Sequence, residues 1–185
     1  SIPSKIGSFS DWTQIDCGRN HTVGIRKNGT LWAWGLGSSG QLGLSNTANN
    51  YSIRQVGALT NWAQVSGGYT HTTAIKTDGT LWAWGMNDYG QLGLSDLTYR
   101  SSPTQVGTLN SWAQVSVKNK ISFALKADGT LWGTGYNSNY QLNLTNAPLQ
   151  YASVNGLSKS KLVQVGVEGD WSKISCGYGI AAIKT

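Results

Sequence analysis

The chain has 185 residues, of which 12% are charged, and its formal net charge is +6 at pH 7. A charged share near half of the usual ~25%, together with 24 Gly and 9 Trp, favours an extracellular, cell-surface or virion β protein over a cytosolic enzyme. No apolar run approaches the roughly 20 residues of a membrane span, so we expect neither a membrane span nor a secretory leader.

Residues 1–10 are predicted to be an orphan final strand, because residues 1–7 match the end of a later repeat at residues 101–107. A motif of the form Asn/Asp-Gly-Thr-Leu-Trp then recurs at residues 28–35, 78–85 and 128–135. Asn-Gly and Asp-Gly readily supply the positive backbone dihedrals of a two-residue turn, so each copy predicts the tip of a β-hairpin.

A second motif, Trp-x-Gln/Lys-Ile/Val, lies upstream of the hairpins and recurs at intervals of about 50 residues. Its copies begin at Trp12, Trp62, Trp112 and Trp171. Each repeat contains four short strands with apolar residues on both faces, so the sheets need cover on both sides. We therefore predict an all-β fold of four-stranded antiparallel β-propeller blades, forming a single array over residues 1–185. The predicted units are the orphan strand (1–10), blade 1 (11–60), blade 2 (61–110), blade 3 (111–170) and a half-blade (171–185).

An array divided in this way leaves one blade face bare at each end. The orphan strand could complete the half-blade within one chain and give a four-bladed ring. Alternatively, two chains could exchange these pieces and close a ring of about seven or eight blades, or a different partner could cap the arc.

The basic residues permit an anionic partner, but their distribution does not favour nucleic acid, since no basic cluster with interleaved aromatics occurs. Four of them follow Ile or Leu at one repeat position, where we expect a solvated edge row that discourages stray strand pairing. These are Arg26, Lys76, Lys126 and Lys184.

The inventory of reactive groups argues against an enzyme. Cys17 and Cys176 share one repeat position that also accepts Gly and Val, so we expect a tight buried slot and free thiols. His21 and His71 also share a position, where Ile121 stands in blade 3, and we expect buried hydrogen-bonding groups rather than a base or ligand. No catalytic triad, metal spacing or phosphate loop is recognisable, so no catalytic residue, metal or cofactor is predicted.

Candidate binding residues lie in the loops after the first and third strands of each blade, which emerge on one face of a four-strand meander. Tyr and Arg are typical interface anchors, whereas the tryptophans at matched repeat positions fit core packing better than sugar stacking. Unconstrained variation of the loops is the competing interpretation. The candidate partner-binding residues are Arg19, Tyr69, Asp88, Tyr89, Tyr99, Arg100, Lys118, Lys120, Tyr136, Tyr140 and Tyr178.

The segments from His71 to Gly93 and from His21 to Gly43 resemble the repeat of the regulator of chromosome condensation family, and Cys17-Gly18 looks like the Cys-Gly pair of that repeat. The resemblance covers nearly the whole chain. It implies a β-propeller whose familiar members have seven blades, so we expect completion by a second chain, or an arc held by a partner, rather than a four-bladed monomer. Members include a nucleotide-exchange factor for a small GTPase that also docks on chromatin, and inhibitors of β-lactamase.

The leading hypothesis is a non-enzymatic protein-interaction or structural scaffold, such as a bacterial surface or phage-virion component, with a protein partner, self-association as a homodimer, or both. A regulator of a partner enzyme, either an exchange factor or a protein inhibitor, is the second hypothesis. It needs a cluster of loop carboxylates, for which Asp88 and Asp96 are the near candidates. A carbohydrate-binding module is the third hypothesis, and it predicts exposed loop tyrosines arranged in one plane.

Overall fold

The computed structural model describes residues 7–138, 142, 158–177 and 180–184, and all regular elements in these ranges are strands. The predicted orphan strand falls largely outside them. The strands are β1 (Trp12–Cys17), β2 (His21–Arg26), β3 (Leu31–Gly35), β4 (Asn50–Gln55), β5 (Trp62–Gly67), β6 (His71–Lys76), β7 (Leu81–Gly85), β8 (Arg100–Gln105), β9 (Trp112–Lys118), β10 (Ile121–Lys126), β11 (Leu131–Gly135), β12 (Lys159–Gln164), β13 (Trp171–Cys176) and β14 (Ile180–Lys184).

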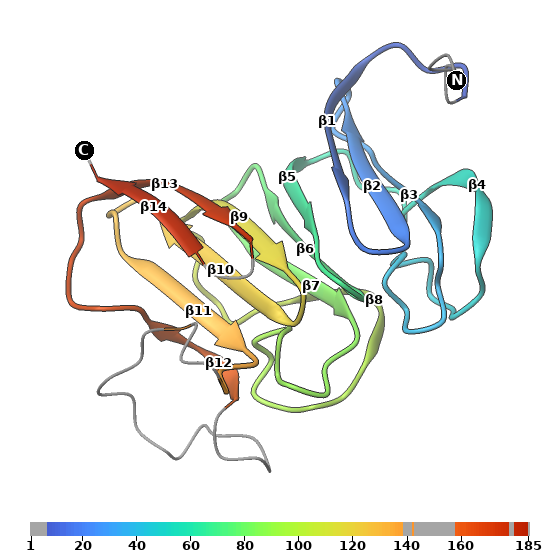
Figure 1. The fold of residues 1–185 in the computed structure, drawn as a ribbon. Coiled ribbons are helices and arrows are strands. Elements are labelled where there is room, and N and C mark those ends of the chain that lie inside the picture. The colour runs from blue at the N-terminus through green and yellow to red at the C-terminus, as the bar shows by residue number, and fades with distance from the viewer. Residues whose placement is uncertain (1–6, 139–141, 143–157, 178–179, 185) are drawn as a thin grey trace, which may run out of the picture.

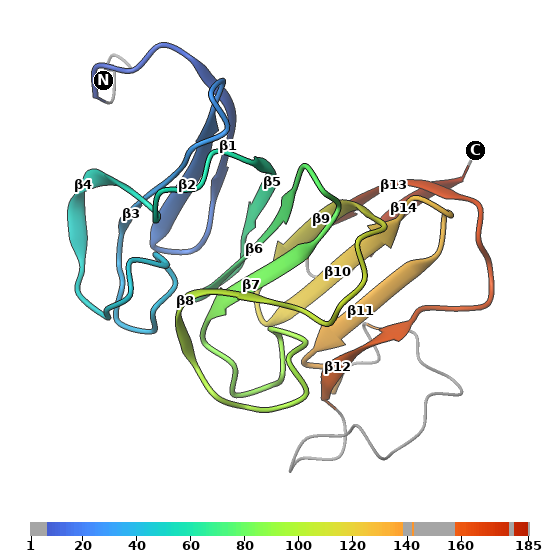
Figure 2. The ribbon, with the colours of Figure 1, turned by 180° about the vertical axis from the view of Figure 1, so that it is seen from behind.

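The strands form antiparallel meanders that stand side by side in an arc (Figure 1). Blade 1 is the sheet β1–β4, blade 2 is β5–β8, blade 3 is β9–β12, and the half-blade is the pair β13–β14. The first strands of consecutive blades contact one another, β1 with β5, β5 with β9 and β9 with β13, and the last strands lie outside, as the reverse view also shows (Figure 2). The predicted propeller-blade architecture is therefore confirmed.

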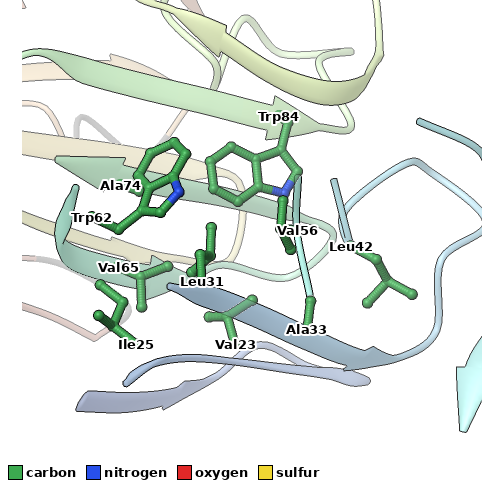
Figure 3. Close-up of a cluster of buried hydrophobic side chains, with 10 residues drawn as sticks. All are labelled: Val23, Ile25, Leu31, Ala33, Leu42, Val56, Trp62, Val65, Ala74 and Trp84. Atoms are coloured by element: carbon green, nitrogen blue, oxygen red, sulfur yellow. The ribbon is translucent and has the colours of Figure 1, made fainter. Parts of the chain in front are cut away.

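The hydrophobic core lies between blades rather than within them. Leu81 and Ala83 pack toward blade 3, whereas Trp84 on the opposite face of the same strand packs toward blade 1. Figure 3 shows the cluster between blades 1 and 2, in which the indoles of Trp62 and Trp84 lie over aliphatic side chains of blade 1. Burying each large apolar side chain contributes about 1.5–3 kcal/mol, so adjacent blades stabilise each other.

Side-chain amides tie the first strands of neighbouring blades together. Gln14 donates from Nε2 to the carbonyl oxygen of Val65 and accepts from the Val65 N–H at Oε1, both at 2.9 Å. Gln114 makes the same pair of bonds with Ile174 at 3.1 and 2.9 Å, and Gln64 accepts from the Val115 N–H at 2.7 Å. The glutamine of the Trp-x-Gln motif is thus an inter-blade bridge, which explains why it accompanies the tryptophan.

The hairpin turns differ from the predicted two-residue type. In the first turn the Gly29 N–H donates to the Arg26 carbonyl, the Arg26 N–H donates to the Thr30 carbonyl, and Gly29 has a φ of 74° while Asn28 does not have a positive φ. This is a three-residue loop in which a type I turn precedes a left-handed glycine. The Asn28 side-chain oxygen accepts from the Thr30 N–H and hydroxyl, and this Asx bonding stabilises the longer loop.

The prediction of a solvated edge row was wrong for Arg26, Lys76 and Lys126, which are buried or half-buried on inner strands, whereas Lys184 is exposed on the edge strand β14. The residues of this row end the second strand of each blade, and their cations lie over aromatic rings. Lys76 is only 7% exposed, with Nζ 3.5 Å from the centroid of the Trp82 ring, and Lys126 Nζ is 4.2 Å from that of Trp132. Arg26 lies 3.9 Å from the Phe9 ring centroid and pairs with Asp11 at 2.8 Å, and Lys184 lies over Trp171. The tryptophans of neighbouring strands flank this position, so a long cationic side chain is attracted to their faces.

The prediction of a buried cysteine slot was wrong for Cys17, which is exposed. The equivalent Gly67 and Val117 are buried because a preceding blade packs against them, whereas no blade among the described residues packs against that side of blade 1. Cys176 is half-buried, and burial raises the pKa of its thiol to about 12, which keeps it protonated. Both thiols are free, as expected.

Candidate functional site

The loops of the meander divide between two faces of the arc. The loops after the first and third strands of a blade emerge on one face, which we call the loop face. The turns between the second and third strands and the links between blades emerge on the other, the hairpin face. On the loop face, backbone hydrogen bonds join the loop after the third strand to the loop after the first strand of the same blade. The donors are the N–H groups of Leu36, Met86 and Tyr136, and the acceptors are the carbonyls of Asn20, Thr70 and Lys120, respectively.

Two buried histidines begin strands β2 and β6, directly after loops of the loop face. His21 Nε2 lies 3.0 Å from Thr72 Oγ1, whose own proton goes to the Gln41 carbonyl, so the imidazole is the donor. His71 Nε2 bonds Ser122 Oγ in the same way at 3.0 Å. Burial lowers the pKa of His21 to about 4 and that of His71 to about 3, so both are neutral near neutral pH. The prediction of buried hydrogen-bonding groups is confirmed.

The inner loops of three blades are linked by backbone hydrogen bonds across the loop face. The Arg19 N–H donates to the Gly68 carbonyl at 3.3 Å, and the Tyr69 N–H donates to the Asn119 carbonyl at 2.8 Å. Asn119 has a φ of 50°, in the left-handed region that asparagine tolerates better than most side chains. These bonds hold the side chains of three blades in a fixed arrangement.

The first side-chain cluster joins blades 1 and 2. The Arg19 guanidinium carbon lies 4.3 Å from the centroid of the Tyr69 ring, a cation–π contact. Beside it is a recess of roughly 230 Å³ lined by Gly18, Arg19, Gly68, Tyr69, Lys118 and Asn119. Arg19 and Lys118 are exposed.

The second cluster joins blades 2 and 3. Lys120 Nζ lies 4.2 Å from the centroid of the Tyr89 ring and donates to the Tyr89 hydroxyl at 3.1 Å. The rings of Tyr89 and Tyr136 pack edge to face, with centroids 5.1 Å apart and planes at 84°. Because Lys118 and Lys120 flank Asn119, the two clusters adjoin. We call Arg19, Tyr69, Lys118, Lys120, Tyr89 and Tyr136 together the aromatic–cation strip.

Three of the predicted site residues, bonded within one loop and the strand start that follows it, lie beside this strip and are not members of it. Tyr99 donates its hydroxyl to Asp88 at 2.7 Å, and Arg100, which begins β8 rather than lying in a loop, pairs with Asp96 at 2.6 Å. Burial, followed by the bond to Asp88, raises the pKa of Tyr99 to about 12. These contacts stabilise the loop between β7 and β8 internally. Tyr140 and Tyr178 lie outside the described residues.

Sequence reasoning missed three members of the recess, Gly18, Gly68 and Asn119. The two glycines carried a signal, because each stands three positions before a histidine. A Cβ atom at Gly18 would lie 2.1 Å from His21 Cε1, and one at Gly68 would lie 2.2 Å from His71 Cε1. Blade 3 has Lys118 and Ile121 at the corresponding positions, so the glycine and the histidine are absent together.

The carboxylates are engaged by other groups of this chain, including Asp88, which directly precedes Tyr89 of the strip. All eight acidic residues lie in the described ranges: Asp11 pairs with Arg26, Asp96 with Arg100, and Glu168 and Asp170 with Lys184. Asp78 and Asp128 accept bonds in hairpin turns, Asp16 accepts from Ser66 and Gly67, and Asp88 accepts from Tyr99. Within the described chain no three His, Cys, Asp or Glu residues gather as metal ligands, and no helix is suited to crossing a bilayer.

The repeat also matches known protein families. The Regulator of chromosome condensation (RCC1) repeat matches residues 28–75 and 78–125, and a second description of the same repeat matches residues 12–41, 62–91 and 112–141. The chain belongs to the RCC1 repeat family. The resemblance inferred from the His-to-Gly segments is therefore confirmed.

Solved structures of RCC1-type propellers share the fold. Yeast RCC1 (Prp20), solved bound to Kap60, matches with a TM-score of 0.82 and 22% identity over 98% of this chain and 44% of that one. Prp20p of Saccharomyces cerevisiae, described with its binding properties to Gsp1p and histones, matches with a TM-score of 0.81 and 20% identity over 98% of this chain and 45% of that one. Human WBSCR16 matches with a TM-score of 0.79 and 22% identity over 94% of this chain and 44% of that one. This chain thus spans less than half the length of these propellers.

Proposed function

We propose that this RCC1-repeat chain is a non-enzymatic protein-interaction module that binds a protein partner through the aromatic–cation strip on its loop face. The observation that carries the proposal is that six predicted binding residues, from the loops and one strand end of three blades, form one connected surface. Tyrosine and arginine are enriched among interface residues that dominate binding energy, and here they are held by backbone bonds between loops. Yeast Prp20, which shares the fold, is described in complex with the protein Kap60.

Site-specific cross-linking tests this proposal. A photoreactive benzophenone amino acid replaces Tyr136 in the strip or, as a control, Thr77 in a hairpin turn on the opposite face. We expect the Tyr136 position to capture a partner that the Thr77 position does not. The captured protein, once purified, should bind the variant Lys120→Ala/Tyr136→Ala at least about tenfold more weakly than the wild type, as hot-spot truncations do. Equal capture at both positions, or unchanged affinity of the variant, would refute the proposal.

Regulation of a partner enzyme is a more specific form of the same proposal. Its support is the similarity to Prp20p, whose binding to Gsp1p has been described. The carboxylate cluster expected for it is not free, because Asp88 accepts from Tyr99 and Asp96 pairs with Arg100. A regulator acting through the strip would therefore use cations and tyrosines instead. Enzyme assays of the captured partner with and without this chain would distinguish a regulator from a simple scaffold.

Self-association is proposed as well, because an apolar residue is exposed on a sheet face at each end of the described array. Ile15 of blade 1 is 50% exposed, whereas the equivalent Val65, Val115 and Ile174 are 0%, 5% and 5% exposed beneath a preceding blade. Ile183 of the half-blade, at the position of the buried Ile25 and Ile75, is 62% exposed. A second copy could cover the first surface with the second, in the way that consecutive blades pack.

The carbohydrate hypothesis has less support. It requires tyrosine faces in one plane, but Tyr89 and Tyr136 are nearly perpendicular, and cations lie over the rings of Tyr69 and Tyr89. Placement at a cell surface or in a virion rests on composition alone and stays a prediction.

A further inference from the structure

We infer that the recess between Arg19 and Lys118 binds a carboxylate, so that the loop face recognises an acidic protein segment. This inference rests on the proposed function and specifies the chemistry of the partner. Three features support it: the shape of the recess, the charge of the residues that line it, and the cations that lie over the neighbouring tyrosine rings.

The recess exists because the histidines beneath it require glycine. A side chain at Gly18 or Gly68 would collide with the imidazole of His21 or His71. The backbone of both loops therefore passes over the rings without side chains at these positions. Arg19, Tyr69, Lys118 and Asn119 form the remaining walls around roughly 230 Å³. This volume is several times the ~30 Å³ share of one water, which leaves room for a carboxylate group and its adjoining methylenes.

The residues that line the recess include cations and no carboxylate. Arg19 and Lys118 both line it, and no carboxylate among the described residues forms an ion pair with either of them or with Lys120. The Tyr69 ring covers one face of the Arg19 guanidinium, which leaves the N–H groups at its edge available as donors. Two cations that share one recess repel each other, and an incoming anion relieves this repulsion while forming charge-assisted hydrogen bonds.

The neighbouring aromatic groups favour a peptide over a nucleic acid. Single-stranded nucleic acid is bound by open aromatic faces on which bases stack, together with a groove of phosphate contacts. Here Arg19 lies over one face of Tyr69 and Lys120 over one face of Tyr89, so fewer open faces remain for stacking bases. Edges and hydroxyls of tyrosine suit the mixed apolar and polar surface of a protein segment.

NMR titration with a synthetic octaglutamate peptide tests the inference. We expect saturable shifts of the backbone amides of Gly18, Gly68 and Lys118, and no such shifts with an octaglutamine peptide. The variant Arg19→Gln/Lys118→Gln should weaken octaglutamate binding about tenfold or more. The control variant Lys27→Gln/Arg54→Gln removes the same charge at exposed positions away from the recess and should leave the affinity within about twofold.

Several results would overturn the inference. Equal weakening by the control variant would indicate attraction to net charge alone, and absence of shifts at the recess would indicate that no carboxylate binds there. Stronger binding of an oligothymidylate at the same amides would favour nucleic acid. If octaglutamate fails while cross-linking at Tyr136 still captures a partner, the carboxylate inference fails and the proposed function survives.

Discussion

At the scale of single residues, the repeat couples a glycine to a histidine. The imidazoles of His21 and His71 bridge neighbouring blades by donating to Thr72 and Ser122, and each ring occupies the space that a side chain at its own loop glycine would need. The Nδ1 atom of each ring is buried without a hydrogen-bond partner among the described residues. A second proton would therefore be placed on an unsolvated nitrogen, which explains why both side chains stay neutral.

The buried histidines predict a loss of stability in mild acid. The unfolded chain takes up protons near pH 6.5, whereas the folded pKa values are about 4 for His21 and about 3 for His71. The unfolded state thus binds more protons below 6.5, and the free energy of unfolding falls with pH until the folded pKa values are reached. Between about pH 7 and about pH 5 the expected loss is about 2 kcal/mol per histidine.

Urea unfolding at the two pH values measures this loss. The double variant His21→Asn/His71→Asn should show a pH dependence smaller by about 4 kcal/mol over the same interval, whatever its stability at neutral pH. The same pH dependence in the variant and in the wild type would contradict the assignment of the acid sensitivity to these rings.

At the scale of elements, the first strands of neighbouring blades are joined by glutamine bridges as well as by apolar packing. Gln14, Gln64 and Gln114 each reach a backbone group of the next blade, whereas Lys173 stands at this position in the half-blade and is exposed. Lys173 therefore provides a matched control position for the bridging glutamine, because no described blade follows the half-blade.

Replacing Gln14 with leucine should destabilise the protein by about 1–3 kcal/mol, because the N–H and carbonyl of the buried Val65 lose their partner. The control Lys173→Leu changes an exposed side chain at the equivalent position and should alter the free energy of unfolding by less than about 0.5 kcal/mol. Chemical denaturation of both variants provides the comparison. Equal effects would mean that the bridge adds nothing beyond the packing of the strand.

At the scale of the whole molecule, each blade presents a tryptophan-bearing face to the blade before it and an aliphatic face to the blade after it. The cluster between blades 1 and 2 combines Val23, Ile25 and Leu31 of the first with Trp62 and Trp84 of the second. The tryptophan-bearing face of blade 1 is the one on which Ile15 is exposed. Its chemistry fits the aliphatic face of another blade.

Self-association through this face makes a testable prediction. Sedimentation of the purified chain should show a concentration-dependent dimer, and Ile15→Asp should weaken it at least about tenfold by burying a carboxylate in an apolar contact. Lys173→Gln should strengthen it, because a glutamine could bridge to the Ile15 backbone as Gln14 bridges to Val65. Tyr51→Asp, a change at an 89% exposed side chain on the outer strand β4, should have no effect. A monomer at every concentration, or a dimer insensitive to Ile15→Asp, would exclude this arrangement.

The sequence by itself determined the blades, because their signals are local and periodic. The Trp-x-Gln motif predicted a first strand, the Asp-Gly-Thr-Leu-Trp motif predicted a hairpin, and the repeated histidine position predicted a buried hydrogen-bonding group. The bridging role of the glutamine was not predicted. The predicted two-residue length of the turn was wrong. The Asn-Gly pair alone does not reveal that the Asn28 side chain bonds Thr30 and stabilises a three-residue loop. The loop face was predicted from meander geometry, and six of its candidate residues meet there.

Only the tertiary structure decided which of those residues meet and which groups are covered. Arg19 and Tyr69, or Lys120 and Tyr89, belong to different blades, so their contact depends on the alignment of one blade with the next. Tertiary contacts also explain the errors over Lys76, which is covered within its own blade, and over Cys17. The first is enclosed by tryptophans of two strands, and the second is exposed because no described blade lies against its side of the sheet. Contacts between repeats are set by packing across the array, which a periodic sequence pattern does not specify.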